Sequence, residues 1–382
     1  MLRFLTAGES HGPGLTTIVE GLPAGLSVDP DAISAELARR RLGFGRGPRM
    51  ALEKDELEIL GGVRFGKTLG GPVSVLIRNT EWDRWSEEMS PLPGEAKRPA
   101  RAPRPGHADL AGMQKYDTHD ARDILERASA RETAARTVVG VLAKELLGAV
   151  DITVLSHVVA IGPAAAPPGE LPTIDDLPAI DASPVRAFGT EAEAAMVAEI
   201  ERAKADRDTL GGVVEVLAHG VMPGLGSHVH FDRKLDARLA EALMSIQAIK
   251  AVEIGDGFET AARRGSEAHD EIRYEDGFVR DTNRAGGIEG GMSIGGVVRV
   301  RAAMKPLSNL MRALQTVDVE SKQPEQAIRE RSDVCAVPAA GVVAEQMVAI
   351  VLAQEVQRKF GGDTVGDLAG AVELYRKRLT HF

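Results

Sequence analysis

Three short stretches of the sequence resemble one another: residues 68–75, 209–216 and 293–300 each carry two glycines directly before a run rich in β-branched residues. Such residues fit a pleated, half-buried surface, and the glycines supply backbone freedom that other residues lack. The stretches therefore predict equivalent strands of antiparallel sheets. Their likeness has two explanations, an internal duplication or chance, and their irregular spacing excludes a solenoid. Further strands are predicted around residues 150–161 and 271–274.

Sequence signals that start and end helices occur between these predicted strands. Asp29 can cap a helix that has Pro30 in its first turn and that Gly43 ends. Residues 129–132 match a capping box and open a segment with apolar residues at helical spacing, which predicts a long, largely buried helix. Further helices are predicted at residues 338–360, which two glycines follow, and at residues 191–207 and 234–249.

Two proline-rich stretches without periodicity, residues 85–106 and 162–189, are predicted to be loops within a single domain spanning residues 1–382. The first is longer than a compact domain needs for a connector and carries four cations before His107: Lys97, Arg98, Arg101 and Arg104. Two interpretations stay open for it, a lid over a site and a solvated, disordered excursion.

Composition narrows the class of protein. The chain has 382 residues, 43% of them apolar, and a formal net charge of −10, which argues against a nucleic-acid partner. A single cysteine, Cys335, excludes an intramolecular disulfide and any multi-cysteine metal site, so a reducing compartment is expected. With no secretion signal and no apolar run near the roughly 20 residues that span a bilayer, we expect a cytoplasmic protein without a membrane partner.

One candidate for proton transfer lies near the N-terminus, where residues 8–12 read Gly-Glu-Ser-His-Gly. Glycines let a backbone approach a ligand closely, and histidine exchanges protons near neutral pH. On residue type alone, His11 is either catalytic or simply structural. A hydrolase built on Ser10 and His11 is a weak alternative, because no third group is evident to orient the base.

Five arginines fall within eleven residues: Arg39, Arg40, Arg41, Arg46 and Arg49. Guanidinium groups match phosphates and carboxylates, so this cluster predicts a polyanionic ligand. The first three arginines could instead complement the end of a helix, but that does not explain Arg46 among glycines.

Four further signals are weaker. Arg127 and Arg131 flank a predicted helix start and could bind an anion, whereas Asp333 beside Arg331 favours an ion pair. Lys305 with Pro306 could be a plain turn. His228 and His230 would share one face of a strand, but no carboxylate cluster accompanies them, so no metal site is predicted.

Taken together, these motifs resemble the chorismate synthase family. The resemblance rests on residues 8–12, 127–133 and 331–336, with residues 39–50, 105–109, 247–250, 290–293 and 305–309 between them in family order. Small departures stand at Phe44, Ile294 and Asn309. The resemblance implies an α+β fold with helices sandwiched between antiparallel β-sheets, assembled as a homotetramer.

The activity implied is that of a carbon–oxygen lyase, the anti-1,4-elimination of phosphate from 5-enolpyruvylshikimate 3-phosphate to give chorismate. It implies reduced FMN as cofactor, with NADPH as one route to its reduction and an external flavin reductase as the other; no reductase domain is recognisable, which favours the second. A non-catalytic flavin- or anion-binding module is the alternative from a different class.

The resemblance also assigns roles. His11 would protonate the departing phosphate, His107 would adjust the protonation of the flavin, and Asp333 and Ser129 would assist proton removal. Ser10, Arg40, Arg46 and Arg49 would meet the substrate or a pyridine nucleotide. The implied flavin contacts are Arg127, Ala128, Ser129, Gln247, Ala248, Gly290, Lys305, Pro306, Leu307, Ser308, Asn309 and Arg331.

Overall fold

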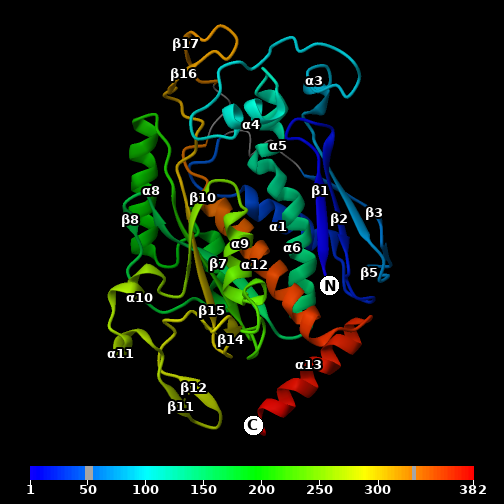
Figure 1. The fold of residues 1–382 in the computed structure, drawn as a ribbon, viewed down its shortest axis with the longest axis vertical. Helices are drawn as coiled ribbons and strands as arrows, with labels where there is room; N and C mark the ends of the chain where they lie inside the picture. The colour runs from blue at the N-terminus through cyan, green and yellow to red at the C-terminus, as the bar shows by residue number, and fades with distance from the viewer. Residues whose placement is uncertain (48–54, 329–332) are drawn as a thin grey trace.

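Two antiparallel sheets enclose a layer of helices in the structure, a computed structural model that describes residues 1–47, 55–328 and 333–382 (Figure 1). The first sheet has the strand order β1 (Arg3–Ala7), β2 (Gly14–Glu20), β6 (Val73–Arg78) and β3 (Glu56–Gly61). The second has the order β10 (Ile249–Ile254), β15 (Val298–Met304), β9 (Gly212–His219), β7 (Thr153–Ile161) and β8 (Ala164–Ala165). The predicted fold class is confirmed.

The helix layer fills the space between the sheets. Its longest member, α12 (Val337–Phe360), packs on β7 and β9, while α6 (Thr133–Gly148) packs on β1 and β2. These two helices also pack on each other, and α1 (Pro30–Arg41) and α9 (Leu235–Met244) flank them. By length and hydropathy α12 could cross a membrane, but 94% of its apolar window is buried inside the protein, so it is the central helix of the core.

The three glycine-rich stretches lead into β6, β9 and β15, as predicted. Strands β9 and β15 are neighbours, and Val216 lies opposite Val300 in their register. Alternate residues of β6, such as Val73 and Val75, are buried against the helices, which is the pattern of a sheet with one covered face. The predicted strands near residues 150–161 and 271–274 are confirmed as β7 and β11 (Ile272–Tyr274).

The predicted helices are present with corrected ends. Asp29 caps α1 by accepting a hydrogen bond from the Asp31 amide at 2.9 Å, and α8 (Thr190–Ala205) and α12 lie where expected. Helix α9, however, stops at Met244, because the backbone turns there and Ile249 begins β10. The capping box at residues 129–132 is also wrong. The Ser129 hydroxyl caps only a short turn, η1 (Ala130–Glu132), and the Glu132 side chain bonds elsewhere.

The two predicted loops differ. Residues 86–106, between α3 (Trp82–Trp85) and α4 (Asp109–Tyr116), contain no helix or strand, as expected, but Trp85, the first residue of the predicted loop, is the last residue of α3. Residues 162–189 contain β8, η2 (Ile174–Asp176) and α7 (Leu177–Ala182), so the prediction of a plain loop there is wrong. The prediction took the prolines as signs of a loop. Pro178, however, lies in the first turn of α7, where the backbone N–H that proline lacks has no partner within the helix.

Several of the remaining elements lie at the two ends of the molecule. Helices α3, α4 and α5 (Arg122–Ala128) and strands β16 (Gln315–Val317) and β17 (Pro324–Gln326) lie at the upper end of Figure 1, and α13 (Val365–Leu379) lies at the lower end. The smaller elements are β4 (Val63–Arg64), β5 (Lys67–Thr68), η3 (Phe231–Arg233), α10 (Phe258–Ala262), α11 (Gly265–Ala268), β12 (Phe278–Arg280), β13 (Ile288–Glu289) and β14 (Met292–Ser293).

Candidate functional site

His11 lies buried between β1 and β2, with 6% of its surface exposed. Its Nδ1 lies 2.9 Å from both carboxylate oxygens of Glu126, and its backbone N–H donates to Oε2 of the same group at 2.9 Å. Burial raises the pKa of the Glu126 carboxyl, but its hydrogen bonds and charge interaction with His11 outweigh this and leave the pKa below its usual value. An ionised Glu126 makes Nδ1 the donor, so proton exchange with a ligand falls to Nε2.

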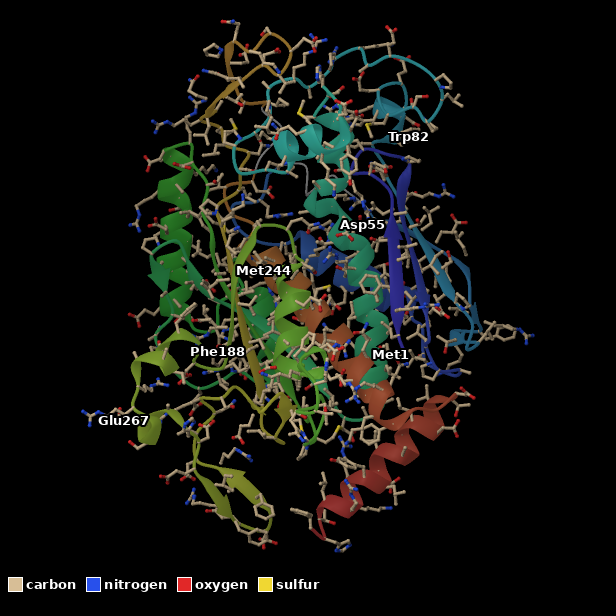
Figure 2. The ribbon with its side chains drawn as sticks, viewed as in Figure 1. Met1, Asp55, Trp82, Phe188, Met244 and Glu267 are labelled. Carbon is tan, nitrogen blue, oxygen red and sulfur yellow. The ribbon has the colours of Figure 1, made fainter. Side chains whose placement is uncertain are left out.

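An aromatic ring holds the other side of this imidazole. Trp85, at the end of α3, stacks on His11 with ring centroids 4.0 Å apart and planes inclined by 26°. The Arg122 guanidinium lies 4.9 Å from the Trp85 ring and donates to Glu126 at 2.8 Å. Figure 2 shows Trp82, the first residue of α3, at the upper end of the molecule. His11 is therefore fixed in orientation from two sides.

The two predicted serines meet beside this histidine. The Ser129 hydroxyl donates to the Ser10 hydroxyl at 3.3 Å, and Asn79 donates to the Ser10 carbonyl at 2.7 Å. Arg127 donates to backbone oxygens of Thr6 and Gly8 at 2.8 and 3.0 Å. Arg131 instead forms an ion pair with the buried carboxylate of Asp55, so it does not join Arg127 in an anion site at this helix start.

His107, like His11, meets a carboxylate through Nδ1. Its Nδ1 lies 2.5 Å from Oδ1 of Asp109, whose other oxygen accepts from Arg104 at 2.8 Å. Asp109 is fully buried; burial raises the pKa of its carboxyl, but the hydrogen bonds from His107 and Arg104 lower it far more, to well below the usual range. An ionised Asp109 thus keeps a proton on Nδ1 of His107.

The segment after β15 packs against this second histidine loop. The Lys305 ammonium donates to the Gly106 carbonyl, and the Lys305 amide donates to the Ala248 carbonyl at 3.0 Å. A side chain at Gly106 would come within 3.3 Å of the Lys305 ammonium and 3.7 Å of Ser308, so this glycine permits a close approach. Burial lowers the pKa of Lys305, and the charge of Lys250 lowers it further.

Arg46 pairs with Asp333 at 2.8 Å, and the Gly47 amide donates to the same carboxylate at 2.6 Å. An ion pair was the structural interpretation of Asp333, and Arg46 is one partner of its carboxylate. The segment Lys305 to Asn309 is linked to this region by two bonds: the Thr209 hydroxyl donates to the Leu307 carbonyl, and the Leu210 amide donates to the Val334 carbonyl, both at 2.8 Å. Arg40 is buried in α1, 5% exposed. Arg49 and Arg331 lie outside the described residues.

A cavity of about 410 Å³ opens beside β1. Arg127 and Gln247, two of the predicted flavin contacts, lie in its lining with Thr6, Glu132 and Arg136. Gln247 donates through its amide nitrogen to Glu132 at 3.2 Å, whereas its amide oxygen is buried without a hydrogen-bond partner in the described part of the chain. A ligand N–H in this cavity would satisfy that oxygen.

Two other features lie elsewhere. Gly290 turns the hairpin between β13 and β14, next to the start of β15, while Lys305 follows its end. The seven residues of β15, which span about 20 Å, separate Gly290 from Lys305 along the chain. His228 and His230 are exposed on a loop, not on a strand, and no group of three metal-ligating side chains occurs within residues 1–47, 55–328 and 333–382.

Comparison with known proteins shows which family this chain resembles in sequence and structure. The sequence model of a family described as chorismate synthase matches residues 2–357. The chain is 61% identical to a chorismate synthase of Acidothermus cellulolyticus, covering 98% of each chain, and 62% identical to one of Salinispora tropica, covering 96% of each. A crystal structure of chorismate synthase superposes with a TM-score of 0.80 at 41% identity, over 100% of this chain and 99% of that one.

This chain belongs to the chorismate synthase family.

The resemblance to chorismate synthases singled out the two histidines, but it did not indicate the groups that orient them. Asp109 stands two residues after His107, so the sequence held a local signal for that pair. Glu126 and Trp85 are 115 and 74 positions from His11, and neither belongs to a motif that marks it as a partner. Only the packing of α3 and α5 against the β1–β2 turn brings them together.

Proposed function

We propose that this protein eliminates phosphate from 5-enolpyruvylshikimate 3-phosphate to give chorismate, with reduced FMN as cofactor. One structural observation supports this proposal in addition to family membership. Two histidines at the same end of the molecule each keep a proton on Nδ1 through a buried, ionised carboxylate. Both Nε2 atoms are thereby assigned to proton exchange, which an elimination that expels an anionic phosphate requires.

His11 is the proposed proton donor to the departing phosphate. Phosphate leaves poorly as a dianion, and a proton delivered to its oxygen in the transition state lowers the barrier. Glu126 holds the ring through Nδ1, and Trp85 stacks on one face of it. Arg46 and Arg40 supply positive charge for the phosphate and carboxylates of the substrate, with Ser10 beside His11.

The residues near the proposed flavin site fit the cofactor. Arg127 supplies a cation and Gln247 a buried amide oxygen without a partner, which suits a ring N–H. Reduced FMN supplies an electron-rich ring system, the property that this redox-neutral elimination needs. His107, with Lys305 beside its loop, would set the protonation around that ring, and Ser129 and Asp333 would assist removal of the substrate proton.

Anaerobic mixing tests the proposal. The protein, FMN reduced with dithionite and 5-enolpyruvylshikimate 3-phosphate are combined, and released phosphate and the absorbance of the conjugated diene are followed together. We expect both signals to rise in equal amounts over many turnovers. Flavin and substrate binding without phosphate release would instead indicate a non-catalytic flavin- or anion-binding module.

The source of electrons is tested in the same vessel. We expect no product from oxidised FMN, substrate and NADPH alone, and full activity once dithionite or a separate flavin reductase is added. Turnover with NADPH and no other reductant would contradict dependence on an external reductase while leaving the elimination itself in place.

A further inference from the structure

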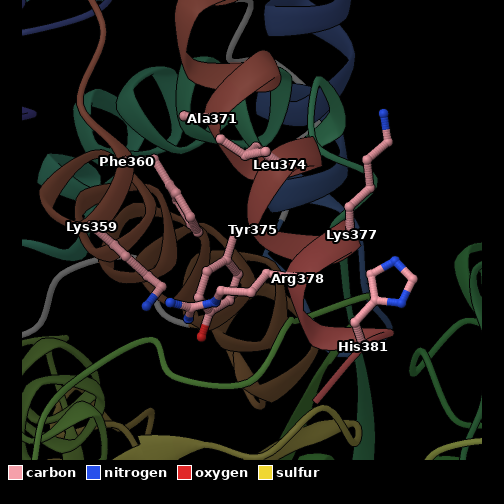
Figure 3. Close-up of a pocket in the computed structure, with 8 residues that line it drawn as sticks. All are labelled: Lys359, Phe360, Ala371, Leu374, Tyr375, Lys377, Arg378 and His381. Atoms are coloured by element: carbon pink, nitrogen blue, oxygen red, sulfur yellow. The ribbon is translucent and has the colours of Figure 1, made fainter.

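A second groove lies at the far end of the molecule, between the end of α12 and α13 (Figure 3). It measures about 740 Å³. The residues that line it, here called the α13 groove, are Lys359, Phe360, Ala371, Leu374, Tyr375, Lys377, Arg378 and His381. The volume falls in the range of roughly 300–1,000 Å³ typical of small-molecule sites. Residues 365–381 lie beyond the segment matched by the family model, which ends at residue 357.

The groove is built on a firmly held helix. Thr364 and Asp367 form a capping box at the start of α13, and Leu368 and Val372 are buried, each 1% exposed. The Tyr375 hydroxyl donates to the Pro223 carbonyl at 3.0 Å. The opposite side of α13 therefore presents its groove residues from a fixed position.

The charged side chains that line the α13 groove are all basic. Lysine, arginine and histidine line the groove, and no carboxylate does. Lys377 has Glu373 as partner at 2.6 Å, but Lys359 and Arg378 have no carboxylate within 4.0 Å in the described part of the chain. Both instead lie against one ring: the Lys359 ammonium is 4.1 Å and the Arg378 guanidinium 4.7 Å from the centroid of Tyr375.

Two like charges on one aromatic ring repel each other, and the ring offsets this only in part. In a chain of net charge −10, cations without a carboxylate partner are the complement of an anion. The apolar surface beside them comes from Phe360, whose ring meets Tyr375 edge-on at 5.4 Å, and from Leu374, which is 71% exposed. The groove therefore offers a charged end and an apolar wall.

We propose that the α13 groove binds a small organic anion with a planar apolar body. Its acidic group lies between Lys359 and Arg378, and its body covers Leu374 and Phe360. The site is distinct from the proposed active site, because α12, with 24 residues and a length of about 36 Å, separates the Asp333 region from Phe360.

Fluorescence titration tests this with 8-anilinonaphthalene-1-sulfonate and its neutral counterpart N-phenyl-1-naphthylamine, using the full chain without substrate or flavin. We expect a saturable component of the sulfonate signal that weakens at least tenfold in Arg378→Gln. The same loss is expected in Leu374→Glu, because a glutamate four residues before Arg378 supplies the missing carboxylate. Lys204→Met, an exposed lysine of α8, should bind as the wild type does.

Leu374 is exposed, so its substitution leaves the fold intact, and circular dichroism of each variant verifies this. The proposal is overturned if both groove variants bind the sulfonate like the wild type, or if the neutral probe binds as tightly as the anion. It is also overturned if sulfonate binding disappears as protein concentration rises and a larger species sediments, since a second copy would then cover the groove. None of these outcomes depends on the proposed reaction.

Discussion

Each of the two site histidines is oriented by a carboxylate that is itself buried and further bound by an arginine: Glu126 by Arg122 and Asp109 by Arg104. A carboxylate in this position fixes the tautomer and the ring plane of its histidine. The arginine keeps the carboxylate ionised, so the positioning depends on three residues and not on two.

Replacing either histidine should slow turnover and leave folding intact. We expect His11→Ala and His107→Ala each to lower kcat by roughly 10²–10⁴-fold, the usual range for general acid–base groups. Steady-state kinetics with dithionite-reduced FMN measures the effect. His230→Ala, an exposed histidine paired with Asp232, is the matched control and should retain wild-type kcat. Wild-type kinetics in a folded His11 or His107 variant would remove the role assigned to it.

The buried pair of His107 and Asp109 has an exposed counterpart with the same spacing, His230 and Asp232. Asp109→Asn should destabilise the protein at pH 7 by about 3 kcal/mol, because Arg104 is left buried without its counter-charge. Asp232→Asn should change stability far less, since solvent screens that pair. Urea unfolding measures both, and equal losses in the two variants would contradict the difference in burial.

At low pH, the difference in unfolding free energy between the wild type and Asp109→Asn should disappear. The pKa of Asp109 in the folded protein lies below the ordinary value of 3.8, so its contribution to stability is complete above that pH. It declines as the pH falls from 3.8 toward the lower folded pKa. We therefore expect the free energies of unfolding of wild type and Asp109→Asn to converge below pH 4, and a constant gap would refute the linkage.

Among the elements, α12 carries a buried charge in its first half. Glu345, fully buried, accepts hydrogen bonds from Arg39 of α1 at 3.0 Å and Ser156 of β7 at 2.8 Å, and it pairs with Lys144 of α6. Burial raises the pKa of Glu345, but these cations lower it to well below its usual range. One carboxylate therefore ties two helices and a sheet to α12.

Removing that charge should loosen the helix layer. We expect Glu345→Gln to reduce the free energy of unfolding by about 3–5 kcal/mol, because it leaves buried cations uncompensated. Glu373→Gln on α13, which removes an exposed pair with Lys377, is the control and should stay close to wild type. Urea denaturation decides, and a Glu345→Gln variant as stable as the control would mean that the ion pairs do not hold the layers together.

The crossing of α6 and α12 depends on a glycine. A β-carbon at Gly140 would lie 2.3 Å from that of Gln346, so Gly140→Ala should cost about 1–3 kcal/mol through overpacking. Gly370 in α13 has open space around it, and Gly370→Ala should stabilise by roughly 0.5–1 kcal/mol through helix propensity. Thermal unfolding should shift in opposite directions, and shifts of the same sign would disprove the close contact.

At the scale of the whole molecule, a homotetramer is the expected assembly. Light scattering after size exclusion should give four times the chain mass at micromolar concentration. A monomer mass at that concentration would show that the assembly expected from the family resemblance does not form in this protein.

Local signals in the sequence determined the elements and the chemistry of single residues. Glycine pairs before β-branched runs located β6, β9 and β15, and Asp29 and Pro30 located α1, because these signals act over a few neighbouring positions. The ordered motifs then indicated the family. The ends of elements were predicted less accurately. The predicted end of α9, Ile249, is five residues beyond its observed end, Met244, because packing sets the last turn.

Partnerships across the chain were decided by the tertiary structure alone. Nothing near His11 in the sequence points to Glu126 or Trp85, and Arg46 meets Asp333 across 287 positions. Gly290, placed with the flavin contacts by resemblance, lies at the opposite end of β15. Side chains at such separations meet only when sheets and helices pack, and packing depends on the shape and burial of the whole chain, which no local pattern encodes.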